Sequence, residues 1–463
     1  MGNSTNAIFK KVIGYFSVNV VVSAIAFSSV IIYSHLLSPQ ELGLYGEFYA
    51  LVPVLTIIIS ANLSHSVLFF YKKENRNFKN YMMSMITFQF FSYFCVVVLI
   101  VFSYELEYIQ RTEFRYYLFA SFLALVFSAR LLCEKLYVAR GKVKSYAKLN
   151  VFYTVALTFL GLIFVYIYPN HWTRIQIEMA LAVSLSIYLF IFFVRVLDFK
   201  INVNFYLVFN ALKFSVPRIP FSLSIAIMPL IDRHMISLYY GYSELGTYVL
   251  ATSYSSVMLV AISAITPAFL PSYYDLMEKK RYEKIDLINK KLSVLIAIGY
   301  LILSLFINDF AGLVSGNDYV LPVFLIPIIL TSYLWHSLSS MYCRVFDYKK
   351  KTFYLSIVAF TSMVLNVLFN FLLIPKLGIL GASIATLLAY FAMAIFSYYI
   401  SRFVVDVHTS PILGLFSGYI FASFLVFLLL MESVYIRFGV LCAILGVAYV
   451  LRKRIFIASG KSN

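Results

Sequence analysis

Apolar stretches of about 20 residues or more recur along the whole chain, separated by short polar connections. Each stretch is long enough for a helix to cross the hydrocarbon core of a bilayer. The stretches show no alternation of period two and are too long for barrel strands, so helices are predicted. We therefore predict an all-α integral membrane protein with about 14 transmembrane helices. The predicted spans are residues 12–34, 44–70, 80–103, 114–136, 148–169, 176–197, 214–239, 246–272, 289–308, 319–342, 353–374, 379–401, 411–431 and 434–451.

A short motif occurs twice. ELGLY at residues 41–45 recurs as ELGTY at residues 244–248, 203 positions later. Each copy follows a long apolar run that begins near a lysine, Lys10 or Lys213, and the spacing from lysine to the motif's leucine is 32 residues in both. Two related membrane halves in one chain are a common plan of secondary transporters, with the substrate held between the halves.

The repeat predicts the domain organisation. We expect a first six-helix lobe at residues 1–205 and a second at 206–405, followed by residues 406–463 with a last helix pair and a cytoplasmic tail. Both lobes start on the same side and contain six spans, so a pseudo-twofold axis along the membrane normal is expected. The charged connection at residues 275–291 is expected to be an amphipathic surface segment.

Charge placement gives the expected orientation. If the N-terminus is cytoplasmic, 30 of the 37 Lys and Arg residues fall on the inner side, six fall toward the outer side, and Arg218 lies inside a span. This matches the positive-inside rule, which places Lys and Arg in cytoplasmic loops. The formal net charge of +17 is therefore the sum of many short loops and does not indicate a nucleic-acid partner.

Composition agrees with this picture. The chain is 62% hydrophobic and 12% charged, with a mean hydropathy of +0.88, which is too apolar for a soluble domain. Its four cysteines lie within or at the ends of predicted helices and are interpreted as small apolar residues, not as a disulfide or metal framework. No catalytic residue, metal or cofactor is expected.

Three stretches carry a resemblance to a known family: LSPQELGLY at residues 37–45, FSVPRIPFSL at 214–223 running on to residues 232–234 and 245–248, and NFLLIPKLGILGASIAT at 370–386. Together they resemble the O-antigen and polysaccharide flippases of the multidrug/oligosaccharidyl-lipid/polysaccharide exporter superfamily. The resemblance covers the first twelve spans, and the third stretch is its most specific part.

The resemblance implies a function and partners. It implies a MATE-like fold that moves undecaprenyl-diphosphate-linked oligosaccharide units, for O-antigen in lipopolysaccharide or a related surface polysaccharide, across the bacterial inner membrane. The implied partners are the lipid-linked oligosaccharide, the lipid bilayer, and a polysaccharide polymerase with its chain-length regulator. It implies a transporter and not an enzyme.

The seventh span holds the densest set of ionisable residues, which are costly inside a membrane and are often functional. On a helix, Asp232 lies about 40° from Arg218 around the axis and Arg233 about 60° to the other side. Ser222 and Pro229 share this stripe. Arginine pairs bidentately with phosphate oxygens and keeps its charge. The stripe predicts a cationic cavity wall; alternatively, Arg218 snorkels to headgroups and Asp232 pairs locally with Arg233.

Other polar positions are further candidates for the cavity. The histidines could equally be hydrogen-bonded interior residues, and the amides could bond between helices. Prolines in the seventh span remove backbone hydrogen bonds and permit bends, so they are hinge candidates. The additional cavity candidates are Arg130, His65, His336, Asn19 and Asn62, and the hinge candidates are Pro217, Pro220 and Pro229.

The acidic residues bear on the competing functions. In the first lobe Glu47, Glu134, Glu178 and Asp198 all lie near predicted helix ends, so no buried carboxylate is expected there. This favours an anionic substrate over a cation-coupled multidrug exporter of the same fold. A peptidoglycan-precursor flippase shares the anionic lipid and stays open. A membrane polymerase or ligase is disfavoured, because such enzymes need a large outer loop and every predicted outer connection is short.

The orientation is directly testable. Both termini should be cytoplasmic, because only that arrangement puts most basic residues inside. A reporter fused after Asn463 should report the cytoplasm, and one fused after Gly241 should report the outer side. The opposite signal at either position would overturn the orientation.

Overall fold

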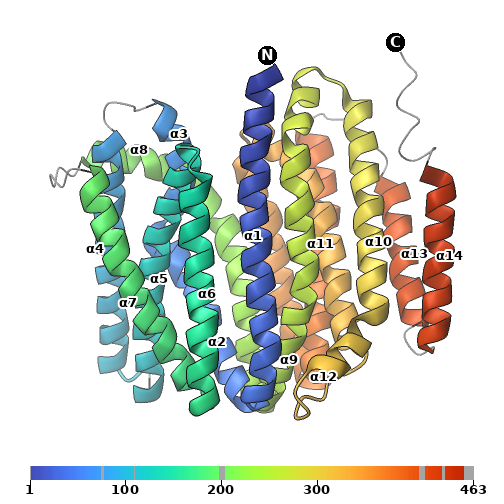
Figure 1. The fold of residues 1–463 in the computed structure, drawn as a ribbon, viewed down its shortest axis with the longest axis horizontal. Helices are drawn as coiled ribbons and strands as arrows, with labels where there is room; N and C mark the ends of the chain where they lie inside the picture. Colours follow the sequence, from blue (N-terminus) through green and yellow to red (C-terminus); the bar gives the residue numbers. More distant parts are fainter. Residues whose placement is uncertain are drawn as a thin grey trace. The chain divides into compact units, whose positions relative to one another are not determined.

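The computed structural model describes residues 2–73, 78–108, 110–197, 204–405, 412–429 and 433–452. Most of these described residues are helical, and none of them forms a strand (Figure 1). The helices are α1 Gly2–Leu36, α2 Pro39–Ser60, η1 Leu63–His65, α3 Val67–Lys73, α4 Phe78–Glu105, α5 Arg111–Ala139, α6 Val143–Ile167, α7 His171–Leu197, α8 Phe205–Ser215, η2 Val216–Arg218, α9 Ile219–Glu278, α10 Tyr282–Val314, α11 Leu325–Tyr348, α12 Thr352–Val405, α13 Ile412–Leu429 and α14 Val434–Arg452.

Each of the fourteen predicted spans contains helix. The 60-residue α9 and the 54-residue α12 each hold two predicted spans, joined at a glycine with non-helical backbone: Gly241 at φ 82° and Gly378 at φ 58°. Both glycines lie in the left-handed region, where a Cβ is unfavourable. Among the described residues, nine helices are long and apolar enough to cross a membrane, and two shorter apolar helices lie in α13 and α14. The predicted all-α membrane fold is confirmed.

Helix α11 differs from its prediction. The span predicted from residue 319 begins only at Leu325, and α11 is not among the nine apolar helices. It packs against α10, α12 and α13, and 19 of its 24 residues are buried. A helix surrounded by protein meets little lipid, so it can carry polar residues such as Thr331, Ser332 and Ser337 that a lipid-facing helix avoids.

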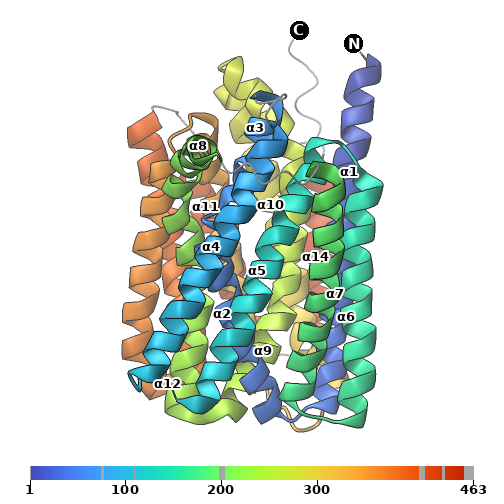
Figure 2. The same cartoon turned by 90° about the vertical axis from the view of Figure 1, so that its left-hand side faces the viewer.

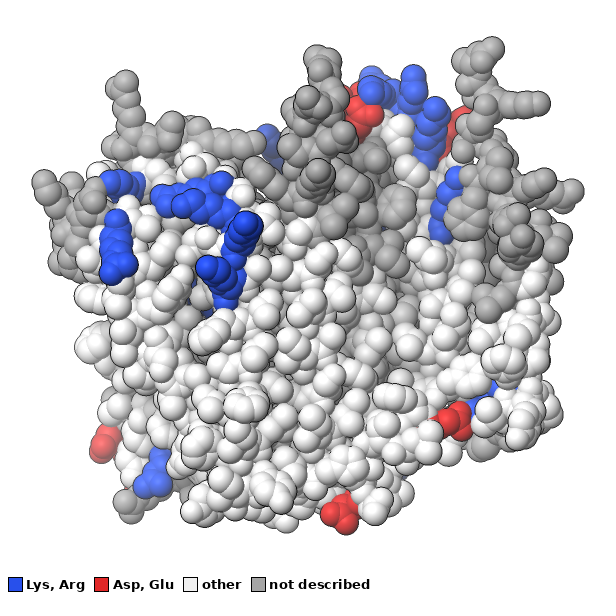
Figure 3. Space-filling view, viewed as in Figure 1, with Lys and Arg blue, Asp and Glu red and all other residues white. Residues whose placement is uncertain are grey.

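The chain divides into two compact units, residues 1–249 and 250–463. In the first unit α1 packs against α6, α2 against α5, and α4 against α5 (Figure 2). The lobe boundary near residues 205 and 206 stays a prediction; residues 198–203, just before it, and residues 453–463 of the predicted tail lie outside the described residues. On the face drawn in Figure 3, the Lys and Arg of the first unit gather toward the end where α1 begins.

The two copies of the repeated motif contact each other within the first unit. A Cβ added to Gly43 would collide with the carbonyl oxygen of Tyr242, and one added to Gly246 would collide with that of Pro39. The contacts are reciprocal: each glycine meets the carbonyl four residues before the glycine of the other copy. Only glycine lets two helix backbones approach this closely, and such approaches permit Cα–H···O contacts.

A third repeat-related pair lies one turn further along. Gly46 packs against the side chain of Val249, and these positions are again 203 residues apart. The two copies of the repeated motif are therefore in contact where α2 meets the second half of α9; the expected pseudo-twofold axis stays a prediction.

Two polar stretches between the predicted spans contain helix. Residues 205–215 form a separate helix, α8, capped by the Asn204 side chain, which accepts from the backbone N–H groups of Tyr206 and Leu207. Figure 1 shows α8 lying across one end of the first unit. The charged segment at 275–291 is built from the end of α9, which runs to Glu278, and the start of α10 at Tyr282; its charged residues from Glu278 to Lys284 are exposed, while Met277 and Ile285 are buried.

Within the second unit, an ion pair ties α14 to α10. Arg437 on α14 donates to both carboxylate oxygens of Asp309 on α10, at 2.8 and 3.1 Å, and its side chain is largely buried. This pair accounts for a basic residue on the predicted outer side.

The glycine contact gives a stability prediction. Gly246→Ala should destabilise the protein by about 1–3 kcal/mol, because the added methyl group meets backbone that cannot yield. Gly299→Ala is the matched control: a Cβ there meets nothing within 4 Å. It should be neutral or stabilising by about 0.5–1 kcal/mol, since alanine favours helix. Thermal unfolding of the purified proteins measures both, and equal effects at the two sites would contradict the close-packing account.

Candidate functional site

A cavity of about 510 Å³ lies between α2 and the first half of α9. Three residues of the predicted stripe, Ser222, Pro229 and Arg233, line it. The rest of the lining is mostly apolar, so the cavity is an apolar space with an arginine at one end and not a cationic channel along its length. The remaining lining residues are Tyr49, Ala50, Pro53, Ile57, Phe221, Ile225 and Ala226.

Polar contacts hold α9 to α2 at the Arg233 end. Arg233 Nη1 donates to the carbonyl of Gly46 at 2.6 Å. The next residue of α2 after Gly46 is Glu47. Its Oε1 accepts a hydrogen bond from the Ser237 hydroxyl at 3.1 Å and lies 2.9 Å from His234 Nδ1. Arg233 is only partly buried, so its guanidinium combines a structural contact with a place on the cavity wall.

A second contact holds the opposite end. Asn62, buried and in a left-handed backbone conformation after α2, donates from Nδ2 to the Ser222 hydroxyl at 2.9 Å and to the Arg218 carbonyl at 3.4 Å. Ser222 and Arg233 are eleven residues apart, so the two contacts are separated by about 17 Å along α9. The half-buried Arg218 lies one turn beyond Ser222 and is not part of the cavity lining.

Asp232 faces away from this cavity. Its carboxylate is buried and accepts from the Tyr248 hydroxyl at 3.2 Å. Tyr248 belongs to the second copy of the repeated motif. Asp232 thus joins the two halves of α9 across the kink at Gly241, which is a structural task distinct from lining the cavity.

The other predicted candidates lie elsewhere. Arg130 on α5 pairs with Glu134 at 2.8 Å, bonds to Asn150 and lies over the Tyr153 ring at 4.8 Å. Asn19 on α1 accepts from the Tyr146 hydroxyl of α6 at 2.9 Å.

The two candidate histidines belong to different units of the chain. His65 is exposed in the single turn η1. His336 lies in α11 of the second unit with its ring 5.0 Å from that of Tyr390, and its Nδ1 is buried without a hydrogen-bond partner. Neither histidine lines the cavity between α2 and α9.

Two of the three hinge candidates lie where the seventh span begins. Pro217 lies in the 3-10 turn η2 between α8 and α9, and Pro220 is in the first turn of α9. Pro229 lines the cavity, and so does Pro53 of α2. The chain changes from α8 to α9 at the first two prolines; whether any of them acts as a hinge stays a prediction.

A buried charged cluster was missed from the sequence. Arg174 and Glu178 lie one turn apart on α7 and are only 6% and 1% exposed. The Tyr45 hydroxyl donates to Glu178 at 3.0 Å, and the Arg174 guanidinium lies 5.2 Å from the Tyr33 ring and 5.3 Å from the Tyr45 ring. Gly161 on α6 makes room, since a Cβ there would collide with the Tyr33 hydroxyl.

This cluster corrects one expectation. The prediction that the first lobe contains no buried carboxylate is wrong, because Glu178 is buried although it lies only two turns from the start of α7. The position of Glu178 near a helix end had indicated that its carboxylate is exposed to solvent. The sequence alone does not show that α1, α2 and α6 cover this end of α7. The i, i+4 spacing of Arg174 and Glu178 was the available signal.

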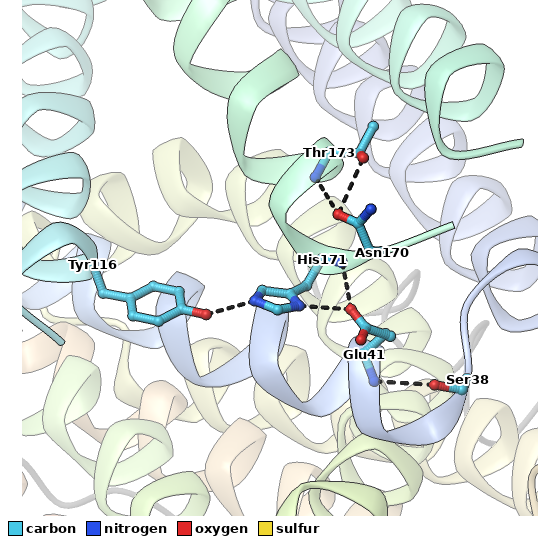
Figure 4. Close-up of polar contacts among 6 residues, drawn as sticks. All are labelled: Ser38, Glu41, Tyr116, Asn170, His171 and Thr173. Atoms are coloured by element: carbon cyan, nitrogen blue, oxygen red, sulfur yellow. Dashed lines mark hydrogen bonds and ion pairs between the residues drawn. The ribbon is translucent and has the colours of Figure 1, made fainter. Parts of the chain in front are cut away.

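A second chain of polar groups joins three helices nearby (Figure 4). The Tyr116 hydroxyl of α5 lies 2.6 Å from His171 Nε2, and His171 Nδ1 lies 2.6 Å from a carboxylate oxygen of Glu41 on α2. The same oxygen accepts from the His171 backbone N–H. Ser38 caps the first turn of α2, and Asn170 caps that of α7. These contacts fix the helix ends beside the repeated motif.

With this geometry in place, comparison with known families identifies the chain. Residues 32–284 match the family described as "Polysaccharide biosynthesis protein". The match covers more than half of the chain, so the chain belongs to this polysaccharide biosynthesis family, and the predicted resemblance is confirmed. Comparison with curated proteins gives no significant match.

Solved structures show the same fold at low identity. The chain is similar to "Lipid II flippase MurJ, inward closed conformation", with a TM-score of 0.71, 14% identity, and coverage of 95% of this chain and 99% of that one. It is also similar to an inward-facing multidrug resistance MATE family transporter of the MOP superfamily, with a TM-score of 0.61, 13% identity and coverage of 85% and 98%. It is likewise similar to an outward-facing multidrug resistance MATE family transporter, with a TM-score of 0.60 and 12% identity. That match covers 86% of this chain and 96% of the other.

The buried cluster gives a second stability prediction. Glu178→Ala should cost about 3–5 kcal/mol, because it leaves the buried Arg174 charge uncompensated. The control Glu244→Ala changes an exposed carboxylate and should stay within about 0.5 kcal/mol. The double variant Arg174→Met/Glu178→Leu should recover most of the loss. Thermal unfolding measures all three, and a neutral Glu178→Ala would rule out the charge-compensation role.

Proposed function

We propose that this protein is a flippase for lipid-linked oligosaccharides of surface polysaccharide synthesis. In this proposal it moves undecaprenyl-diphosphate-linked repeat units, for O-antigen or a related polymer, from the cytoplasmic to the outer leaflet of the bacterial inner membrane. The observation that carries the proposal is the cavity between α2 and α9, with Arg233 on its wall, in a chain of the polysaccharide biosynthesis family.

The chemistry of the cavity suits such a cargo. A lipid-linked oligosaccharide combines a pyrophosphate, sugars and an apolar tail. Arg233 offers a guanidinium that stays charged and can pair with phosphate oxygens. Arg218, half-buried one turn beyond Ser222, would meet the pyrophosphate first from the cytoplasmic side. The hydroxyl of Ser222 and the ring of Tyr49 supply groups able to bond to or stack on sugars.

The repeat contact suits alternating access. In the proposed orientation, Gly43 near the start of α2 and Gly246 near the middle of α9 both lie toward the outer side, so their close approach would close the outer side of the path. Outward opening would require these backbones to separate, with the break at η2 and the kink at Gly241 as the places where the backbone can bend. Closure of the cytoplasmic side of the path while the outer side is open would complete the cycle.

A cation-coupled exporter is the second candidate, and a specific observation favours it. Glu178 is a buried carboxylate in the first unit, and one of its oxygens has no hydrogen-bond partner. A carboxylate of this kind could exchange a proton during transport. The first candidate is preferred because the family match concerns polysaccharide biosynthesis.

Substitution of the two arginines tests the path. Arg218→Ala and Arg233→Ala should each abolish surface-glycan export at normal protein levels, and Arg218→Lys should retain part of it. The control Arg115→Ala removes an exposed arginine far from the stripe in sequence and should leave export unchanged. Export is measured by complementation of a deletion strain; full complementation by both alanine variants would refute the cationic path.

The driving force can be tested separately. The cargo carries about two negative charges, and moving one charge outward across 100 mV yields about 2.3 kcal/mol. An imposed potential, inside negative, should therefore stimulate flipping in proteoliposomes without a pH or sodium gradient. Asp232→Asn should impair folding without changing this dependence. Strict dependence on a proton or sodium gradient, with no response to potential, would favour ion exchange through Glu178, Asp232, His65 or His336.

A further inference from the structure

A second hollow lies on the side of the first unit, between α6 and α7, which pack side by side (Figure 2). Its volume is about 910 Å³, and its walls are almost wholly apolar. The lining runs on α6 from Ala147 to Ala156 and on α7 from Leu181 to Tyr188. Phe152, on its edge, is 78% exposed, so the hollow opens on the surface of the unit.

Small side chains create this hollow. Ala147 and Ala156 on α6 and Ser184 on α7 all line it, while larger neighbours such as Phe152 and Tyr188 form its rims. Tyr188 is held in place because its hydroxyl lies 3.0 Å from that of Tyr137 on α5. The Tyr188 side of the groove is therefore anchored to α5.

The length of the groove matches one leaflet. From Ala147 to Ala156 the helix rises about 14 Å, close to half of the roughly 30 Å hydrocarbon core of a bilayer. The groove begins one turn inside the N-terminal end of α6. A chain lying in it would run from that end of the helix pair toward the middle of the membrane.

The same end of the groove carries positive charge. Lys148 lines the groove and is exposed, and Lys144, one turn earlier on α6, is also exposed. Lys148 lies about 8 Å from the first residue of α6, within reach of the membrane surface for a lysine that extends its ammonium toward the headgroups. Lys142, also exposed, precedes the helix. An anionic headgroup would meet complementary charge only at this end.

We propose that the α6–α7 groove binds an anionic phospholipid of the inner leaflet, with its acyl chain along the groove and its net negative headgroup at Lys148. The apolar walls provide most of the binding free energy through burial of methylene groups, and the lysines select the headgroup. This lipid site is separate from the cavity between α2 and α9, and it does not depend on the proposed transport function.

Lipid titrations of the full-length protein test the site. Delipidated protein in detergent is titrated with phosphatidylglycerol or phosphatidylcholine of identical acyl chains, and bound lipid is counted by native mass spectrometry. Phosphatidylglycerol should bind at least about fivefold more tightly, since one basic residue near an anionic surface contributes about 1 kcal/mol. Lys148→Gln should remove this preference and leave phosphatidylcholine binding unchanged.

Two further variants separate the groove from general charge. Ala156→Phe fills the groove and should weaken the binding of both lipids by about tenfold or more, which corresponds to the loss of roughly two buried methylenes. Ser184→Phe fills the groove from α7 and replaces the first variant if that one folds poorly. Lys213→Gln, an exposed lysine on α8 outside the groove, should change neither affinity.

Three results would overturn the proposal. The first is equal affinity of the wild type for the two lipids. The second is equal loss in Lys148→Gln and Lys213→Gln, which would indicate a diffuse charge effect. The third is displacement of phosphatidylglycerol by an equal concentration of undecaprenyl diphosphate, which would assign the groove to the transported lipid instead.

Discussion

The close approach of Gly43 and Gly246 is the contact on which the described first unit depends. Each glycine lies against the carbonyl oxygen four residues before the other, so two helices that are far apart in sequence meet backbone to backbone. In a membrane there is no hydrophobic force between helices, and association rests on close packing and polar contacts. Two glycines related by the internal repeat supply this packing, and side chains of any size at either position would push α2 and α9 apart.

The position of the candidate site follows from that contact. Once α2 and the second half of α9 are fixed at the glycines, Tyr248 reaches back across the Gly241 kink to Asp232 and sets the direction of the first half of α9. Arg233 and Asn62 then tie this half to α2 at two points, and the cavity lies between them. The anionic, sugar-bearing lipid that we propose as cargo would meet the arginine on the wall of this cavity. The stability of the first unit and the proposed transport would therefore depend on the same pair of helices.

The sequence predicted the helices well, because a bilayer requires apolar segments of one length and every predicted span contains helix. The stripe of Ser222, Pro229 and Arg233 was also recognisable, since helical periodicity places them on one face. Three features were not predictable. The burial of Glu178 depends on the packing of α1, α2 and α6 against α7. Helix α11 can carry polar residues because protein surrounds it. Asp232 accepts a hydrogen bond from Tyr248, although its angular position on the helix was also compatible with lining the cavity. Each depends on contacts between helices that no local pattern encodes.

The accessibility of Ser222 tests the central claim most directly. Ser222→Cys is introduced after replacement of Cys95, Cys133, Cys343 and Cys442, and the thiol is labelled in sealed vesicles with a membrane-impermeant reagent applied to one side at a time. With the outer ends closed at the glycine contact, the account predicts labelling from the cytoplasmic side only, and protection by an added undecaprenyl-diphosphate-linked oligosaccharide. Labelling from the outer side only, or labelling that the lipid-linked sugar leaves unchanged, would contradict it.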